Sequence, residues 1–295
     1  MIQPAASPRA ERFGRHPTGW TGLAVLLALL IMTGFWQSLR VWSYGLVRQA
    51  EIWHTEWRLS HWPMLQNTHF RLYYPPGQSP EAHLVLAEAS RALSGESHSL
   101  GIRPQGRLVV VLYASQAAMN RAVGIAPAVN NIGYDFNGIM DILSPSAWLG
   151  TSKTAFKQFA FQGPVDHELG HALLNLKADG NYPNWFNEGV AQYEDYRMTG
   201  YQWVTSGNRL AGSLYSMRQL DDQFYALPNQ ALAYRQGLSL VEYLEQLQGA
   251  GGFRRFLGHL AAGQSFDSAL SRTYHIASSE SLWQHWHQWV TEPRQ

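Results

Sequence analysis

Runs of apolar residues divide the chain into a short N-terminal part and a longer remainder. The stretch from Trp20 to Trp36 is almost wholly apolar, and no Asp, Glu, Lys or Arg occurs between Arg15 and Arg40. A run of this length can span a bilayer, and its flanking tryptophans suit the two interfaces. The expected organisation is an N-terminal tail at 1–18, a transmembrane anchor at 19–39, a juxtamembrane helix or linker at 40–63, and one domain at 64–291.

The residues around the apolar run predict how it sits in the membrane. Phe35, Trp36 and Gln37 follow the run where a signal peptidase would need small residues, so a retained anchor is favoured over a cleaved signal peptide. Arginines before the run favour an N-terminus inside the cell, although arginines after it make the bias nearly even. We expect a single-pass protein of the cell membrane, with a cytoplasmic N-terminus and the domain outside, in the periplasm or beyond.

The remainder begins with strand patterns and ends with helix patterns. Short apolar or alternating runs predict strands at 69–74, 107–113 and 139–143, with helices between them from Ser79 to about Ser97 and from Ser115 to Gly124. After Gly163 the periodicity is helical almost to the end. Helices are expected at 165–177, 185–198, 213–223, 231–248, 252–262 and 278–290. This order predicts an α+β fold, with a small strand-containing lobe followed by a helical lobe.

Composition narrows the chemistry that this domain can perform. The chain has no cysteine, which excludes disulfides, thiolate catalysis and sulfur-ligated metal. Its 22 basic residues against 21 acidic ones give a net charge of +1, so nothing indicates nucleic acid as a partner. With 12 histidines present, His and carboxylate remain as the candidate metal ligands.

One predicted helix carries a metal-binding pattern. His167, Glu168 and His171 match H-E-x-x-H, and residues four apart on a helix share one face, so both imidazoles can reach one ion. A catalytic zinc needs a third protein ligand, and the next helix offers Glu188 in Trp-Phe-Asn-Glu-Gly-Val-Ala. Taken alone, Glu188 would read as a solvated helix carboxylate.

The two motifs, in this order, resemble those of the gluzincin zinc metallopeptidases, and specifically the peptidase-MA-like and aminopeptidase N-type branches. The resemblance is good over 165–245 and loose over 65–290. It implies a thermolysin-like two-lobed catalytic domain, one Zn²⁺ per chain on His167, His171 and Glu188, and Glu168 as the base that activates water for hydrolysis of a peptide or protein substrate. Tyr234, in a Tyr-x-x-Gly segment, inherits the role of stabilising the transition state, and Asp195 that of orienting a ligand histidine.

Several alternatives stay open at this point. Tyr234 is otherwise a core tyrosine, and Asp195 a solvated aspartate. Aminopeptidases of the family hold the substrate amine with a Glu in a G-x-M-E-N strand, which here reads Asn137 to Asp141 without a clear equivalent, so endopeptidase action is preferred. The same stretch is a candidate edge strand for pairing with an extended peptide, with Asp141 as a weak substitute for that Glu. A catalytically inert binding or sensor domain, or hydrolysis of a non-peptide substrate, are the rival functions.

Overall fold

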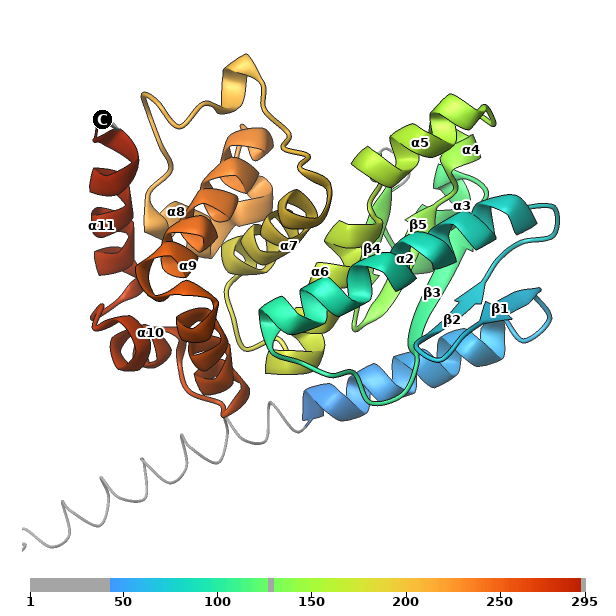
Figure 1. Ribbon diagram of the computed structural model, residues 1–295, viewed down its shortest axis with the longest axis horizontal. Coiled ribbons are helices and arrows are strands. Elements are labelled where there is room, and N and C mark those ends of the chain that lie inside the picture. The colour runs from blue at the N-terminus through green and yellow to red at the C-terminus, as the bar shows by residue number, and fades with distance from the viewer. Residues whose placement is uncertain (1–42, 127–129, 293–295) are drawn as a thin grey trace, which may run out of the picture. The chain divides into compact units, whose positions relative to one another are not determined.

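A five-stranded mixed sheet forms the first half of the fold in the computed structural model, which describes residues 43–126 and 130–292 (Figure 1). The strands are β1 (Met64–Gln66), β2 (Phe70–Tyr73), β3 (Leu108–Tyr113), β4 (Gly133–Phe136) and β5 (Ile139–Leu143). Their order is β1-β2-β3-β5-β4; β2, β3 and β5 run parallel, and β1 and β4 pair antiparallel at the two edges. The short strand β4 therefore closes one side of the sheet.

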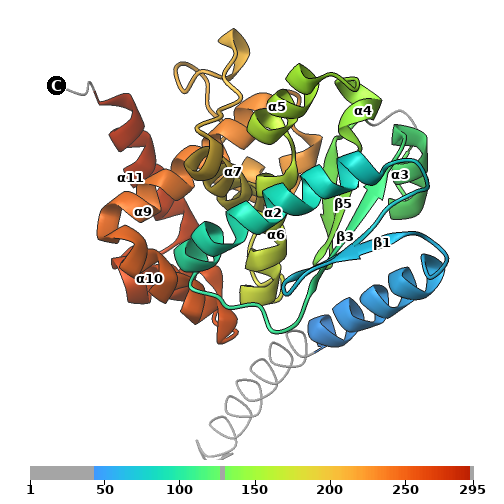
Figure 2. The same cartoon turned by 45° about the vertical axis from the view of Figure 1, so that its right-hand side comes forward.

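Side chains alternate across the central strands and build two separate cores. On one face, residues such as Leu72, Val110 and Ile142 join the main core with α2 (Ser79–Leu100) and α6 (Val165–Ala178). On the other face, Val111 and Tyr113 pack with α3 (Gln116–Val123) and with residues that flank or belong to the helix over 43–58. Figure 2 shows α2 running across the front of the sheet, with α6 behind it. The sheet is thus covered by helices on both faces.

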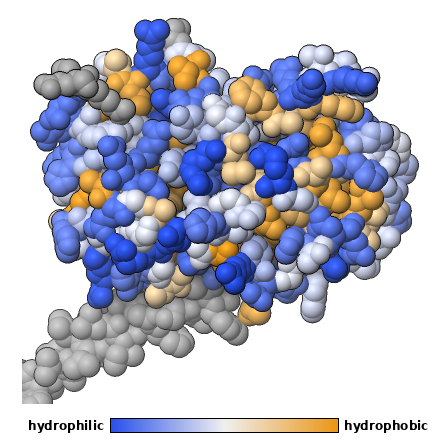
Figure 3. All heavy atoms as spheres, in the orientation of Figure 1, coloured by the Kyte–Doolittle hydropathy of each residue, from blue (hydrophilic) through white to orange (hydrophobic). Residues whose placement is uncertain are grey.

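Helices make up the second half of the fold. They are α4 (Pro145–Trp148), α5 (Lys153–Gln162), α6, α7 (Asn184–Thr199), α8 (Met217–Gln223), α9 (Gln230–Ala261), α10 (Phe266–Tyr274) and α11 (Ser279–Thr291), with 3-10 turns at Ser206–Asn208 and Phe224–Ala226. The long helix α9 is interrupted by non-helical backbone at Gln248 and Gly249. Trp286 of α11 is fully buried against this helical part. The face drawn in Figure 3 is mostly hydrophilic, with apolar side chains scattered over it.

The α+β class is confirmed, with a small sheet and a mostly helical body. The three predicted strands correspond to β2, β3 and β5, and the predicted interruption near 249 is the break in α9. Ser115 caps α3 as expected, since its hydroxyl accepts from the backbone N–H of Ala118. Helix α2 begins at Ser79, but the pair Ser79-Pro80 predicts Ser79 as its N-cap, whereas the N-cap is Gln78. Strands β1 and β4 and helices α4, α5 and α10 were not predicted.

The helix over residues 43–58, here called helix 43–58, is docked on the domain. Its Tyr44 hydroxyl donates to Oδ1 of Asn175 at 2.8 Å, and Arg48 pairs with Asp179 at 2.8 Å, so both contacts reach the C-terminal end of α6. Further along the same helix, Glu56 pairs with Arg71 of β2. In the part of the chain that the structure describes, no helix is long and apolar enough to cross a bilayer. The expected anchor at 19–39 lies outside the described residues.

Candidate metal centre

Helix α6 is held rigidly, and this fixes the direction of the side chains in its first two turns. Asp166 is buried at the start of α6 and accepts two hydrogen bonds from the guanidinium of Arg91 in α2, at 2.9 and 2.8 Å. Burial alone raises the pKa of Asp166, and the neighbouring Arg91 opposes that rise. Leu169 and Leu173 are completely buried on the opposite side of α6. His167 and His171 therefore project from a helix that cannot easily rotate.

Close approaches at glycines bring two further helices against α6. A Cβ on Gly170 of α6 would lie 3.1 Å from the Cα of Ala191 in α7. A Cβ on Gly189 of α7 would lie 2.4 Å from the carbonyl oxygen of Gly237 in α9. Glycine is required where backbones approach this closely. The glycines of the three sequence motifs thus set the spacing of the helices that carry the candidate site residues.

Three side chains meet where these helices cross. The Nε2 atoms of His167 and His171 are 3.1 Å apart, and Oε2 of Glu188 lies 3.4 Å from each of them. Tetrahedral zinc with bonds of about 2.0–2.1 Å would place its ligand atoms roughly 3.3–3.4 Å apart. Among the described residues, these are the only three His, Asp or Glu side chains whose ligand atoms gather within 4.8 Å. The geometry fits one zinc ion.

The electrostatics of the three side chains also favour a bound metal cation. Oε2 of Glu188 is buried, and no donor in the described part of the chain gives it a good hydrogen bond. Burial by itself would lower the pKa of His171, but the carboxylates of Glu188, Glu168 and Asp135 together outweigh burial and raise that pKa to about 10. Burial would raise the pKa of Glu188, and the two imidazoles instead lower it. The cluster therefore favours positive charge at its centre, which a divalent cation supplies.

The predicted base and the predicted tyrosine line the same cavity as the ligands. This cavity, of about 350 Å³, is lined by Glu168, Tyr234 and all three ligand residues, and a second one of about 590 Å³ adjoins it. Burial raises the pKa of Glu168 well above that of an ordinary carboxyl, although His171 opposes the rise. A Cβ on Gly133 would lie 2.6 Å from Oε1 of Glu168 and 2.7 Å from Cβ of Pro164, so a side chain at this position of β4 would displace the predicted base.

Among the described residues, Asp195 lines the larger cavity together with His167 but makes no hydrogen bond to a ligand histidine. It lies two turns beyond Glu188 on α7, roughly 10 Å along the helix axis, and its carboxylate accepts from the hydroxyl of Thr199 at 3.1 Å. Oδ1 of Asn187 instead contacts Nδ1 of His171 at 2.9 Å. Asn187 is therefore the residue that orients a ligand histidine, as partners of the second ring nitrogen commonly do.

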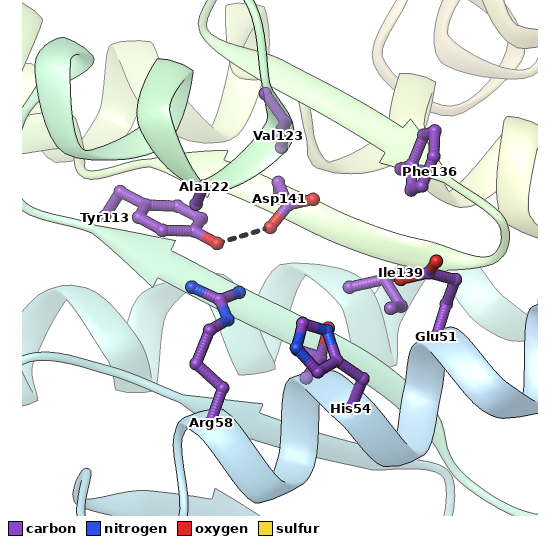
Figure 4. A pocket seen from close by; sticks show the side chains of 10 residues that line it. Glu51, His54, Arg58, Tyr113, Ala122, Val123, Phe136, Ile139 and Asp141 are labelled. Atoms are coloured by element: carbon purple, nitrogen blue, oxygen red, sulfur yellow. Dashed lines mark hydrogen bonds between the residues drawn. The ribbon is translucent and has the colours of Figure 1, made fainter.

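The expectation that the stretch from Asn137 to Asp141 is the edge strand is wrong. β5 is paired on both sides, with β3 and β4, and the edge strand is β4. Asp141 also points away from the metal cluster, into a cavity of about 120 Å³ between the sheet and helix 43–58, where it accepts a hydrogen bond from Tyr113 at 2.8 Å (Figure 4). Because neighbouring side chains on a strand point to opposite faces, Asp141 cannot reach the cluster and cannot replace the amine-binding Glu.

Two residues of the cavity were missed by sequence reasoning. The hydroxyl of Tyr225 donates to Oε1 of Glu188 at 2.7 Å. Asp135 of β4 lines the cavity; Asn175 donates to its Oδ1 at 2.5 Å, and its Oδ2 is buried without a partner in the described structure. Burial, partly opposed by His171, raises the pKa of Asp135 to about 6. No sequence motif marks Tyr225. Asp135 lies two residues after Gly133, in a run whose alternation is too short to predict a strand.

Two solved structures are similar to part of this chain. The chain is similar to Legionella pneumophila aminopeptidase A, solved with aspartic acid, at 11% identity over 78% of this chain and 28% of that one, with a TM-score of 0.47. It is also similar to an M1 zinc metallopeptidase from Deinococcus radiodurans, at 19% identity over 79% and 52% of the two chains, with a TM-score of 0.41. The chain thus spans about half or less of their lengths. No curated protein sequence matches.

A family model matches most of the domain. The model described as Peptidase MA superfamily matches residues 92–292, which include α6, α7 and the beginning of α9 with its tyrosine. The matched region covers well over half of the chain and contains the complete cluster of His167, His171 and Glu188. This chain belongs to the Peptidase MA superfamily.

Proposed function

We propose that this protein is a membrane-anchored zinc-dependent peptidase, acting as an endopeptidase and holding one Zn²⁺ per chain on His167, His171 and Glu188. The observation that carries the proposal is the set of distances of 3.1, 3.4 and 3.4 Å among the three ligand atoms. Such an ion, when bound, lowers the pKa of a water molecule and polarises a carbonyl group.

The chain's own residues supply the remaining steps of hydrolysis. Glu168, buried in the same cavity and with a raised pKa, takes the proton from the attacking water and delivers it to the leaving amine. The hydroxyl of Tyr234 stabilises the developing oxyanion, as oxyanion donors do in a water-poor site. Tyr225 holds Glu188 in place through its hydrogen bond.

The edge strand supports a peptide as the substrate class. β4 ends the sheet and lines the cavity through Gly133, Tyr134 and Asp135. An extended peptide can add to such an edge through main-chain hydrogen bonds. The adjoining cavity of about 590 Å³ continues past His167 to Tyr201 and Trp203, which leaves room for substrate residues on a second side. Space on two sides favours cleavage within a chain.

Aminopeptidase action is the second candidate, and Asp135 favours it. A buried carboxylate with one unpaired oxygen in the ligand cavity is suited to bind a free α-amine. The two candidates are separated by hydrolysis of matched peptides with free and acetylated N-termini. An endopeptidase cleaves the free and the acetylated peptide at similar rates. An aminopeptidase cleaves the free peptide from its N-terminus and does not cleave the acetylated peptide.

The catalytic proposal is tested by a quenched peptide library with wild type and Glu168→Gln. Cleavage by wild type that falls at least about 10²-fold in Glu168→Gln supports the enzyme, since the substitution keeps the side-chain shape but removes the base. Equal cleavage by the two proteins would point to a contaminating protease. Absence of cleavage with zinc bound would favour the rival function, an inert binding or sensor domain.

The location of the protein is part of the same proposal. The uncharged stretch at 19–39 would anchor a single-pass protein with a cytoplasmic N-terminus and the peptidase domain outside. A peptide or protein near the membrane would then be the substrate. Full-length protein should resist extraction from membranes by alkaline carbonate, and externally added protease should reach the domain in intact spheroplasts. Release by carbonate would contradict the anchor.

A further inference from the structure

Helix 43–58 has the opposite arrangement of side chains to a surface helix of a water-soluble protein. Its four charged residues, Arg48, Glu51, Glu56 and Arg58, are all half-buried on the side that faces the domain. Arg48 and Glu56 are engaged in ion pairs there. A surface helix ordinarily turns its apolar stripe inward and its charges outward. Here the charges point inward.

Most exposed positions of the same helix are apolar or aromatic, and the polar ones are Ser43, Gln49 and His54. Leu46, Ala50, Trp53 and Trp57 recur at helical spacing and share one face. Leu46 is 55% exposed, Trp53 68% and Trp57 76%. Every exposed position in residues 43–61 is uncharged, apart from any charge on the histidines. This surface, defined by Leu46, Val47, Ala50, Trp53 and Trp57, is called the tryptophan face.

The position of the tryptophan face in the chain identifies its partner. The uncharged stretch that precedes it ends at Leu39, which is only fourteen residues before Trp53 in the sequence. Tryptophan and leucine on one side of a helix, close to an apolar segment, are typical of helices that lie in the membrane interface. A second copy of the chain fits less well. A four-turn helix face measures roughly 24 Å by 10 Å, far below the ~800 Å² that each partner of a stable dimer buries.

We propose that the tryptophan face lies in the headgroup region of the bilayer, so that helix 43–58 attaches the domain flat to the membrane surface. This inference rests on the anchor of the proposed function and adds an orientation to it. The contacts of Tyr44 and Arg48 with α6 make helix 43–58 part of the domain rather than a loose tether. The domain therefore has one fixed orientation towards the lipid.

The absence of cysteine allows a direct test in the full chain. Single-cysteine variants Leu46→Cys and Trp57→Cys carry a nitroxide spin label in phosphatidylcholine–phosphatidylglycerol vesicles. Leu247→Cys is the matched control, because Leu247 is also helical and 41% exposed. Collision rates with oxygen, which concentrates in lipid, and with a water-soluble nickel chelate report the surroundings of each label. The proposal predicts an oxygen-to-nickel ratio at least about fivefold higher at positions 46 and 57 than at 247.

Each other result overturns the proposal in a recognisable way. Ratios at 46 and 57 equal to that at 247 place the tryptophan face in water. Spin–spin broadening at 57 with a low oxygen ratio would show a contact between copies instead. A label at Leu30→Cys tests the anchor separately from the tryptophan face. A lipid-exposed label at 30 with water-exposed labels at 46 and 57 would support the anchor and contradict only the proposed orientation of the domain.

Discussion

Replacing Gly189 with alanine tests whether the close approach of α7 and α9 holds the metal centre together. The new Cβ would lie 2.4 Å from the carbonyl oxygen of Gly237 and 2.7 Å from its carbonyl carbon, whereas ordinary contacts begin at 3.4 Å. Because both atoms belong to backbone, no side chain can rotate away. The two helices must therefore separate by about 1 Å, which is large for a close-packed interior.

This separation of the helices should lower both the stability of the fold and the affinity of the metal centre for zinc. Overpacking of this kind costs about 1–3 kcal/mol, and a displacement of about 1 Å at reacting groups costs about 10²-fold in rate. Gly189 follows Glu188 directly, so the ligand moves with the helix. We expect Gly189→Ala to lower the free energy of unfolding by about 2 kcal/mol in urea titrations and to weaken zinc binding against a competing chelator.

Gly258→Ala in α9 is the matched control for Gly189→Ala. A Cβ at Gly258 meets nothing within 4 Å. This substitution exchanges glycine for alanine in a helix without a clash, and it should stabilise the protein by about 0.5–1 kcal/mol. If Gly189→Ala behaved like Gly258→Ala, with unchanged unfolding and zinc affinity, the contact between α7 and α9 could not be the feature that positions the ligand.

Three further predictions concern single side chains. Burial raises the pKa of Glu194 to about 7, so the folded state keeps a proton that the unfolded chain releases at lower pH, and the free energy of unfolding should fall as pH rises from about 4.5 to 7. In Glu194→Gln, the free energy of unfolding from urea titrations should depend less on pH across that range. An unchanged pH dependence would count against the raised pKa. Asn187→Ala, which removes the partner of a ligand histidine, should weaken zinc affinity by about 10–100-fold in chelator competition. Tyr225→Phe, which removes the hydrogen bond from Tyr225 to Glu188, should mainly weaken zinc binding. Tyr234→Phe should keep zinc and lower kcat by about 10²-fold; identical effects of the two changes would refute the separate roles.

The sequence predicted the features whose residues lie close together in the chain. Spacing of four residues was enough to bring His167 and His171 onto one face, and the buried run of β3 was readable because it is wholly apolar. β4 was missed because it is a four-residue edge strand with glycine and aspartate in it. α10 was also missed, although Ser265 at its N-cap is a signal that could have been used.

Long-range contacts could not be predicted in the same way. Tyr225 is 37 residues from Glu188 and reaches it only because the 3-10 turn after α8 returns to the cavity. Asp141 was placed beside the site by its position in the chain, but the pleat of β5 directs it to the opposite face of the sheet. The inward charges of helix 43–58 likewise became visible only when its docked side was known.

The central claim is that His167, His171 and Glu188 together hold one zinc ion with Glu168 beside it as the base. The most direct test is the zinc content of purified full-length protein by atomic emission, for wild type, Glu168→Gln and Glu188→Gln, with folding verified by circular dichroism. We expect about one zinc per chain in wild type and in Glu168→Gln, and a strong loss in Glu188→Gln. Well-folded wild type without zinc, or Glu188→Gln with full zinc, would contradict it.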